Sequence, residues 1–304
     1  MKSAIYRHYG PPEVVTIEDL PKPEPKPNEI LVRIQNTTVT SGDVRLRAFD
    51  FPPVFWLPAR FIFGFFGPKK KTLGHEWSGV VEETGAAVKK FKTGDEVIGT
   101  TTLLTVGSHA EYLCLPVTWK YGVIDYKPNI LNFESAAALP IGGMTALFLL
   151  KKANIQSNQK VLVYGASGSV GTFAVQIGTA FGASVTGVCS AANADMVKSM
   201  GAETVIDYQS QDYTESESRY DIVFDAVGKS SKSQAKKVLK RGGTFISIKM
   251  ITSERPEDLA ELIAMAEKGA IKPYIDRKFK LADIQQAHSY VDSGRKKGNV
   301  VIEI

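Results

Sequence analysis

The sequence predicts an α/β fold in two parts, a β-rich, barrel-like domain followed by a doubly wound parallel sheet. Up to about residue 120, short runs of alternating apolar residues are separated by glycine and proline turns, which is typical of barrel strands. From about residue 134, strand and helix patterns alternate, which is typical of a parallel sheet covered by helices. With 304 residues, 43% of them hydrophobic, the chain is long enough for two separate cores.

The order of these patterns predicts three stretches of chain. Residues 1–120 form the β-rich domain, residues 121–265 form the α/β domain, and residues 266–304 return to the first domain. The return is expected because Asn299–Ile304 has the pattern of a strand, which can pair with the strands of the first domain.

Composition excludes several classes of protein. The net charge of +5, from 37 basic and 32 acidic residues, is too small to mark a nucleic-acid-binding protein. Two cysteines, Cys114 and Cys189, cannot build a disulfide scaffold and fit a reducing compartment, so we expect a cytoplasmic location. The first residues lack the apolar core of a signal peptide.

One apolar and aromatic segment, Phe51–Gly67, needs comparison with a membrane span. Three prolines and Arg60 interrupt it, and a spanning helix needs roughly 20 mostly apolar residues, so no span is expected. The prolines predict a non-helical segment. It is either a partly buried loop or the hydrophobic mouth of a substrate pocket, with Trp56 and Phe61 contacting substrate. The Lys69–Lys71 run that follows could touch anionic lipid, although such a run is more often a solvated turn.

The strongest motif is the string KVLVYGASGSVG at Lys160–Gly171. An apolar strand leads to Gly165, where a tight turn begins; Gly168 lets the backbone approach a pyrophosphate, and Gly171 lets the next helix pack closely. The N-terminus of that helix offers unpaired N–H groups to phosphates. Ala166 replaces the first glycine of the usual dinucleotide motif. The strand-to-helix context predicts a dinucleotide site, and an ordinary turn is the alternative.

The residues after the next strands indicate which dinucleotide binds. NAD sites usually place a carboxylate about 20 residues after the glycine turn, and here that position is Ser190. Ser190, Asn193 and Tyr208 can donate hydrogen bonds to a 2′-phosphate, which favours NADP(H). The first cation after Ser190 is Lys198, so a site that accepts both cofactors remains the alternative.

Several further strings occur in a characteristic order, and together they resemble the medium-chain dehydrogenase/reductase family over nearly the whole chain. The resemblance is to its zinc-free, quinone-oxidoreductase-like branch. It implies a GroES-like β-barrel catalytic domain and a Rossmann domain. The strings are TLGHEWSGVVEETGAAVKKFKTGDEVIG (72–99), GSHAEYLCLP (107–116), SAAALPIGGMTAL (135–147) and VFDAVG (223–228).

The resemblance also implies which residues contact the cofactor. By match of motif, these are Thr145, Ala166, Gly168, Val170, Gly171, Ser190, Tyr208, Val227 and Asn299.

The family's zinc enzymes use a thiolate, the histidine of a Gly-His-Glu motif and a third ligand. His75 matches that histidine, but Thr40 stands at the thiolate position and no cysteine lies in residues 140–145. A catalytic zinc needs three protein ligands, so no metal is expected and His75 is interpreted as a structural or pocket residue. Without a Lewis acid, acceptors that polarise themselves are favoured, such as quinones and α,β-unsaturated carbonyls.

The predicted function is therefore an NADPH-dependent, zinc-independent oxidoreductase that transfers hydride directly to a small electrophilic acceptor. Thr40 and Ser41 are the expected donors to the developing oxyanion, with the proton coming from water. The alternatives are a low-turnover NADPH-binding redox sensor or interaction protein, and an alcohol dehydrogenase. Between Ile248 and Asp258 the chain is shorter than members of the family that it resembles, which often build a dimer contact from this region. Whether this protein forms a homodimer is therefore left as an alternative.

Overall fold

The structure, a computed structural model, describes residues 1–304 and divides them into two compact units. Unit 1 comprises Met1–Ile141 and Ile275–Ile304, and unit 2 comprises Gly142–Tyr274. The boundary near residue 120 was placed too early, because β7 (Ile124–Tyr126) pairs with β5 (Glu96–Thr100) inside unit 1. The second boundary lies at 274 rather than 265.

Unit 1 is built on a seven-stranded sheet that the C-terminal segment completes. The strands follow the order β13-β14-β3-β4-β5-β7, and β6 also pairs with β3. A two-stranded sheet, β1-β2, accompanies it. The remaining strand bounds are β1 Lys2–Tyr6, β2 Val15–Asp19, β3 Glu29–Thr38, β4 Glu76–Thr84, β6 Tyr112–Pro116, β13 Ile275–Lys280 and β14 Asn299–Glu303.

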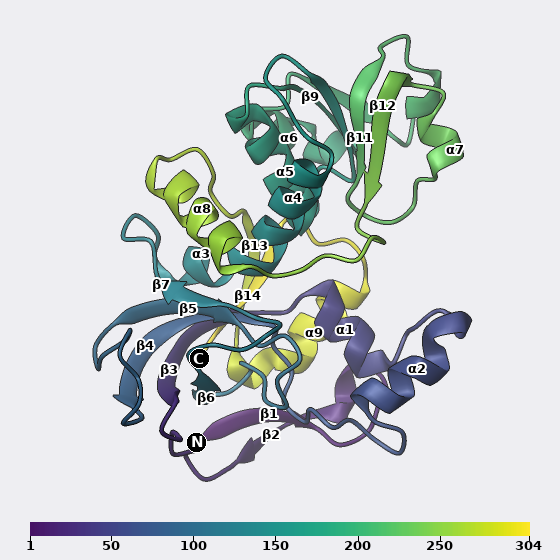
Figure 1. Ribbon diagram of the computed structural model, residues 1–304. Helices are drawn as coiled ribbons and strands as arrows, with labels where there is room; N and C mark the ends of the chain where they lie inside the picture. Colours follow the sequence, from purple (N-terminus) through teal and green to yellow (C-terminus); the bar gives the residue numbers. More distant parts are fainter. The chain divides into compact units, whose positions relative to one another are not determined.

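The predicted C-terminal return is present in unit 1. Strand β14 pairs antiparallel with β3, and helix α9 (Ile284–Asp292) packs against helix α1 (Ser41–Ala48). Figure 1 shows this yellow segment beside the purple N-terminal strands. Its apolar residues share one buried cluster with those of the first strands, including Tyr6, Leu46, Ile284, Val300 and Ile302. Unit 1 therefore has a core drawn from both ends of the chain.

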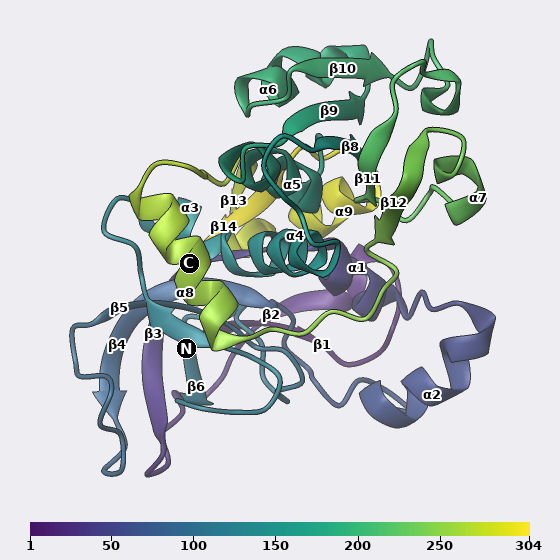
Figure 2. The same ribbon diagram turned by 45° about the horizontal axis from the view of Figure 1, so that its top comes forward.

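Unit 2 is a five-stranded, all-parallel sheet in the order β10-β9-β8-β11-β12, which Figure 2 shows from β10 downwards. This is the doubly wound order, with the first strand in the middle. The strands are β8 Lys160–Tyr164, β9 Ser184–Cys189, β10 Thr204–Asp207, β11 Tyr220–Asp225 and β12 Leu239–Ser247. The helices are α4 Pro140–Lys152, α5 Ser169–Ala180, α6 Ala194–Ser199, α7 Lys232–Ala235 and α8 Pro256–Glu267.

The aromatic segment predicted to be non-helical contains helix α2 (Pro53–Phe63), so that prediction is wrong. Pro53 occupies the first helical position, where its missing N–H is not needed. Pro58 lies one turn further on, where proline removes one hydrogen bond. No helix in the structure is both long enough and apolar enough to cross a bilayer.

Candidate functional site

The first cluster of polar groups in unit 1 forms at the N-terminus of α1. Thr40 is the N-cap, and its hydroxyl accepts the backbone N–H of Asp43 at 3.1 Å. The same hydroxyl donates to the Asp43 carboxylate at 2.6 Å, and the Thr40 N–H donates to that carboxylate at 2.9 Å. This reciprocal capping box orients the Asp43 side chain through local contacts alone.

Asp43 in turn holds His75, which lies just before β4. The fully buried carboxylate accepts the Gly74 N–H and contacts Nδ1 of His75, both at 2.7 Å. Burial alone would raise the pKa of Asp43. The charge and hydrogen bond of His75, the charge of His109 and the Thr40 hydroxyl outweigh burial and hold that pKa well below its usual range. Asp43 is therefore an anion that fixes the imidazole with Nδ1 inward, while Nε2 has no protein partner.

Behind Asp43 lie two further histidines that are fully buried. Nε2 of His109 donates to the carbonyl of Thr38 at 2.9 Å, and its ring lies edge to face with His288, with centroids 5.7 Å apart. Neither ring nitrogen of His288 has a partner. Burial, together with the charge of His109, lowers the pKa of His288 to about 3, and burial lowers that of His109. Both rings are neutral near pH 7.

Glu76 is a buried carboxyl group next to His75. Its oxygens accept the Thr38 hydroxyl and the Ile141 N–H, each at 2.7 Å. Burial raises the pKa of Glu76 to about 7, although these two hydrogen bonds and the charge of Lys296 oppose the rise. Burial likewise lowers the pKa of Lys296 to about 8.

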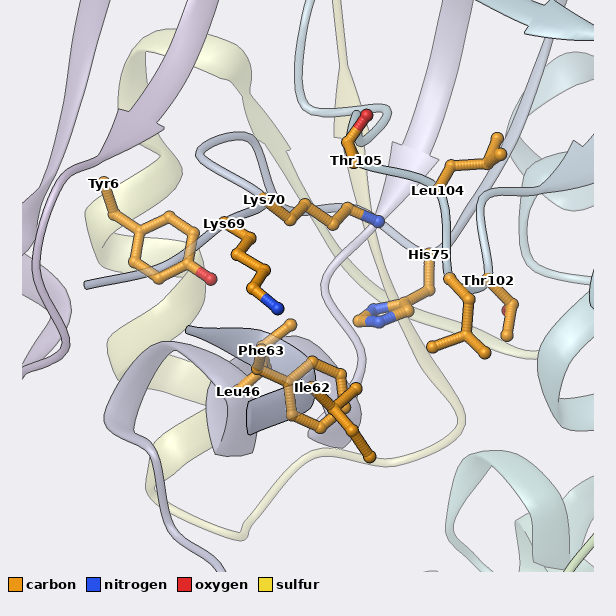
Figure 3. Close-up of a pocket in the computed structure, with 11 residues that line it drawn as sticks. Tyr6, Leu46, Ile62, Phe63, Lys69, Lys70, His75, Thr102, Leu104 and Thr105 are labelled. Carbon is orange, nitrogen blue, oxygen red and sulfur yellow. The ribbon is translucent and has the colours of Figure 1, made fainter. Parts of the chain in front are cut away.

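The His75 ring lines a cavity of about 210 Å³ within unit 1. Figure 3 shows the ring and the Lys70 side chain projecting into this space, with Ile62 and Phe63 along its lower side and Tyr6 at one end. The Lys70 ammonium donates to the Thr101 hydroxyl at 2.8 Å. The full lining is Tyr6, Leu46, Ile62, Phe63, Lys69, Lys70, His75, Thr102, Leu103, Leu104 and Thr105. The cavity is mainly apolar, with a few cationic and hydroxyl groups.

The residues predicted to act in catalysis or to contact substrate do not line this cavity. The proton of the Thr40 hydroxyl is donated to Asp43, so Thr40 caps a helix and has no proton left for an acceptor oxygen. Ser41 is exposed, and neither residue lines the cavity. The aromatic segment does reach the cavity, through Ile62 and Phe63 rather than through Trp56 and Phe61. Trp56 packs instead on Phe49 and Arg60.

The residues around His75 do not fit a catalytic zinc. The hydroxyl at the thiolate position, Thr40, is committed to Asp43, and no three His, Cys, Asp or Glu side chains converge as metal ligands. Of the two thiols, Cys114 lies in β6 and Cys189 in β9 of unit 2. The site thus lacks both the thiolate and a set of three convergent ligands.

In unit 2, most predicted cofactor residues gather at one edge of the sheet. Ser190 follows β9 and Tyr208 follows β10, and these strands pair in parallel, with Cys189 opposite Asp207. Gly165 follows β8 and Val227 follows β11, which also pair in parallel, with Tyr164 opposite Asp225. Ligands of doubly wound sheets bind at this carboxyl edge. The Ser190 hydroxyl caps no helix, and the side-chain amide oxygen of Asn193 is buried and unpaired.

The glycine turn has the geometry that the motif requires. Gly165 adopts φ +82°, and a Cβ there would lie 2.4 Å from Val227. A Cβ on Gly171 would lie 2.1 Å from the Gly165 carbonyl, whereas one on Gly168 would meet only ordinary contacts. Helix α5 begins at Ser169, so the N–H groups of Val170 and Gly171 in its first turn have no partner within the helix. Ala166 is fully buried, and its N–H donates to the Val188 carbonyl at 3.0 Å, which ties the turn to the end of β9.

Two predicted cofactor residues are not part of this edge of the sheet, and Asp225, which holds the loop after β11, was not predicted from the sequence. Thr145 is half-buried on α4 of unit 2, whereas Asn299 is buried at the start of β14 in unit 1. Asp225, buried at the end of β11, accepts the Gly228 N–H at 2.8 Å and the Ser247 hydroxyl at 3.0 Å. It fixes the loop that carries Val227. The apolar run VFDAVG contains a carboxylate at a strand end, which is the signal that could have identified it.

Comparison with known proteins identifies the class. A family model described as an alcohol dehydrogenase GroES-like domain matches residues 26–128, and one described as a zinc-binding dehydrogenase matches residues 169–272. A 2-methylene-furan-3-one reductase of Solanum lycopersicum is 31% identical over 99% of this chain and 79% of its own. An NADPH-dependent alkenal/one oxidoreductase of Arabidopsis thaliana is 28% identical with the same coverage. The quinone oxidoreductase structure from Coxiella burnetii has a TM-score of 0.89 at 26% identity, covering 100% of this chain and 99% of that one.

These matches confirm the predicted fold class, a GroES-like domain combined with a Rossmann-type parallel sheet. The chain is an oxidoreductase that uses a nicotinamide cofactor. It belongs to the medium-chain dehydrogenase/reductase family, in the quinone-oxidoreductase-like branch.

Proposed function

We propose that the protein reduces quinones or α,β-unsaturated carbonyl compounds with NADPH and without zinc. The observation that carries the proposal is His75, held by a buried carboxylate in the wall of an apolar cavity that lacks a thiolate ligand. The names of the relatives, an alkenal/one oxidoreductase and quinone oxidoreductases, support the same substrate class.

The side chains of unit 1 supply the proton. A bound nicotinamide supplies hydride to an electron-poor carbon of the acceptor, which leaves an enolate or quinol oxygen with the electron pair. Nε2 of His75 donates its proton to that oxygen, and the neutral ring keeps its Nδ1 proton on Asp43. Solvent then returns one proton to Nε2, so each cycle consumes one acceptor, one NADPH and one proton. His75 thus replaces Thr40 and Ser41 as the donor we assign.

The carboxyl edge of unit 2 would hold the dinucleotide. The N–H groups of Val170 and Gly171 at the start of α5 would bind the pyrophosphate, and Ser190, Asn193 and Tyr208 would bind the 2′-phosphate. The unpaired side-chain oxygen of Asn193 could accept a hydrogen bond from a ribose hydroxyl but not from the phosphate itself, and the tight glycine turn at Gly171 supports close approach of the helix N-terminus. We expect tighter binding of NADPH than of NADH, and Ser190→Asp should weaken NADPH selectively in a fluorescence titration.

The test is NADPH oxidation with a panel of quinones, enals, enones and simple ketones, with and without a chelator. We expect turnover of the first three classes, none of the ketones, and no effect of the chelator. Chelator-sensitive ketone reduction with stoichiometric zinc would refute the proposal.

The His75 role has its own test. His75→Gln retains a hydrogen-bond donor but cannot titrate, and we expect it to lower kcat by roughly 10²–10⁴-fold. Affinity for NADPH should stay unchanged, because His75 lies in unit 1 and lines the cavity rather than the glycine turn. Thr40→Val tests the earlier assignment, and we expect it to act mainly through loss of the capping box.

Location and assembly remain proposals as well. Both thiols are free, which suits a reducing, cytoplasmic compartment. Strand β12 ends the sheet of unit 2 with an open edge, and light scattering would show whether a homodimer forms.

A further inference from the structure

The exposed apolar surface of unit 1 is concentrated in one segment. Eight of the sixteen large apolar side chains that are exposed in the whole chain lie within residues 54–66. Phe66 is fully exposed, Val54 is 83% exposed and Phe55 is 62% exposed. Figures 1 and 2 both show α2, which carries most of these residues, extending away from the rest of unit 1. Contiguous apolar surface of this kind marks an interaction site.

The segment is fixed at its base, so the exposed face is a defined surface. The Tyr9 hydroxyl donates to the carbonyl of Phe63 at 3.0 Å, and the Phe63 ring stacks on Phe51. The Arg60 guanidinium lies 4.0 Å from the ring centroid of Phe49 and close to two other aromatic rings. Ala59 is the only residue of α2 that is buried.

The charged residues around this apolar surface indicate which kind of partner it binds. From Phe51 to His75 there is no acidic residue, whereas Arg60 and Lys69–Lys71 are basic. Lys69 and Lys71 are exposed on the stretch that directly follows the apolar residues. A second copy of the chain would bring the same cations against them, which is unfavourable. An anionic lipid surface complements both features, because aromatic residues enter the headgroup region while lysines pair with the lipid charge.

We propose that α2 and residues 64–71 dock the protein onto anionic membrane surfaces. At 11 residues, α2 is too short to span a bilayer and lies along its surface instead. The docking surface is continuous with the cavity, because Ile62 is exposed and also lines it. Resting on the proposed function, this continuity implies that the preferred acceptors are lipophilic and enter from the bilayer.

The test is co-sedimentation of the full chain with phosphatidylcholine vesicles, with and without phosphatidylglycerol, in the absence of cofactor and acceptor. We expect binding that requires the anionic lipid and weakens as salt rises. The triple variant Val54→Glu, Phe55→Glu, Phe66→Glu should bind at least tenfold more weakly, and Lys71→Glu should weaken the dependence on phosphatidylglycerol. None of these four residues lines the cavity, so turnover of a water-soluble acceptor should not change.

Ile251→Glu is the matched control, because Ile251 is equally exposed and apolar but lies in unit 2; it should bind like the wild type. Absence of binding to anionic vesicles, or equal binding by the triple variant, would overturn the proposal. So would light scattering that shows a dimer which the triple variant dissociates, since a second copy would then cover the surface. Because vesicle binding is measured without turnover, its failure is distinguishable from failure of the proposed activity.

Discussion

Replacing His288 with leucine should remove an acid-sensitive element from unit 1. His288 lies on α9 with no exposed surface, and neither ring nitrogen has a hydrogen-bond partner. A proton on this ring in the folded state would be a buried charge without a partner. The unfolded chain, in contrast, hydrates the protonated ring freely.

The size of the effect follows from the two pKa values. Burial lowers the pKa of His288 to about 3 in the folded protein, whereas its ordinary value of 6.5 applies to the unfolded chain. As pH falls, the unfolded chain therefore takes up a proton on His288 at a higher pH than the folded protein does. Stability is therefore lost as pH falls from about 6.5 toward 3. The loss is about 2 kcal/mol between pH 7 and pH 5, and about 5 kcal/mol below pH 3.

Tryptophan fluorescence during urea unfolding measures this loss in the appropriate unit, because Trp56, Trp77 and Trp119 all lie in unit 1. The quantity to compare is the free energy of unfolding of the variant minus that of the wild type at each pH. For His288→Leu, this difference should rise by about 2 kcal/mol from pH 7 to pH 5. The matched control is His8→Leu, which removes an exposed imidazole instead of a buried one.

A constant difference for His288→Leu across this range would refute the reasoning. It would mean that water or a rearranged partner solvates the ring in the folded state. A fixed offset from altered packing is compatible with the prediction, because only the change with pH reports on protonation.

Three further predictions concern buried or crowded groups. Burial raises the pKa of Glu76 from 4.5 to about 7, so the contribution of Glu76 to the stability of unit 1 should fall by up to about 3 kcal/mol as pH rises from 4.5 to 7. This change opposes that of His288, and the free energy of unfolding of Glu76→Gln minus that of the wild type should rise by the same amount in the fluorescence assay. Asp292→Asn should cost about 1–2 kcal/mol in urea unfolding, because the buried Arg47 guanidinium loses the negative charge of its partner at 2.7 Å. A cost no larger than that of Asp125→Asn, which neutralises an exposed pair, would contradict this. Gly165→Ala should weaken NADPH binding and destabilise unit 2 more than Gly242→Ala does, because both glycines adopt φ +82° but only Gly165 is crowded. Thermal unfolding measures the loss of stability, and a fluorescence titration measures NADPH binding. Equal effects of the two substitutions would mean that the positive φ, and not crowding, causes the whole loss.

The sequence predicted the fold well because both periodicities are strong and the glycine turn has a strict context. It misplaced the boundary near residue 120, since the short strand β7 has only three residues and pairs with a distant partner. The helix at Pro53–Phe63 was missed because proline is a helix breaker everywhere except in the first turn.

The candidate site was predicted in part. Residues at strand ends could be placed because parallel strands bring their carboxyl ends to one edge. The roles of Thr40 and His75 could not, because they depend on Asp43, whose carboxylate accepts from the Thr40 hydroxyl three residues before it and contacts His75 32 residues after it. A tertiary hydrogen bond of this kind leaves no periodic signal. Likewise, the exposure of α2 follows from packing and cannot be predicted from its apolar composition.

The core of unit 1 contains β14, and this has a consequence for synthesis in the cell. Strand β3 cannot gain its neighbour β14 until 163 residues beyond Ile141 have been made, which takes roughly 8–30 s at about 5–20 residues per second. Unit 2, by contrast, is continuous and can fold as soon as Tyr274 has emerged. During this interval, the β3 edge and the apolar residues destined to meet α9 are open to other chains. Nascent chains stalled between residues 142 and 274 should therefore recruit chaperones through unit 1, and release of the last 30 residues should end that recruitment.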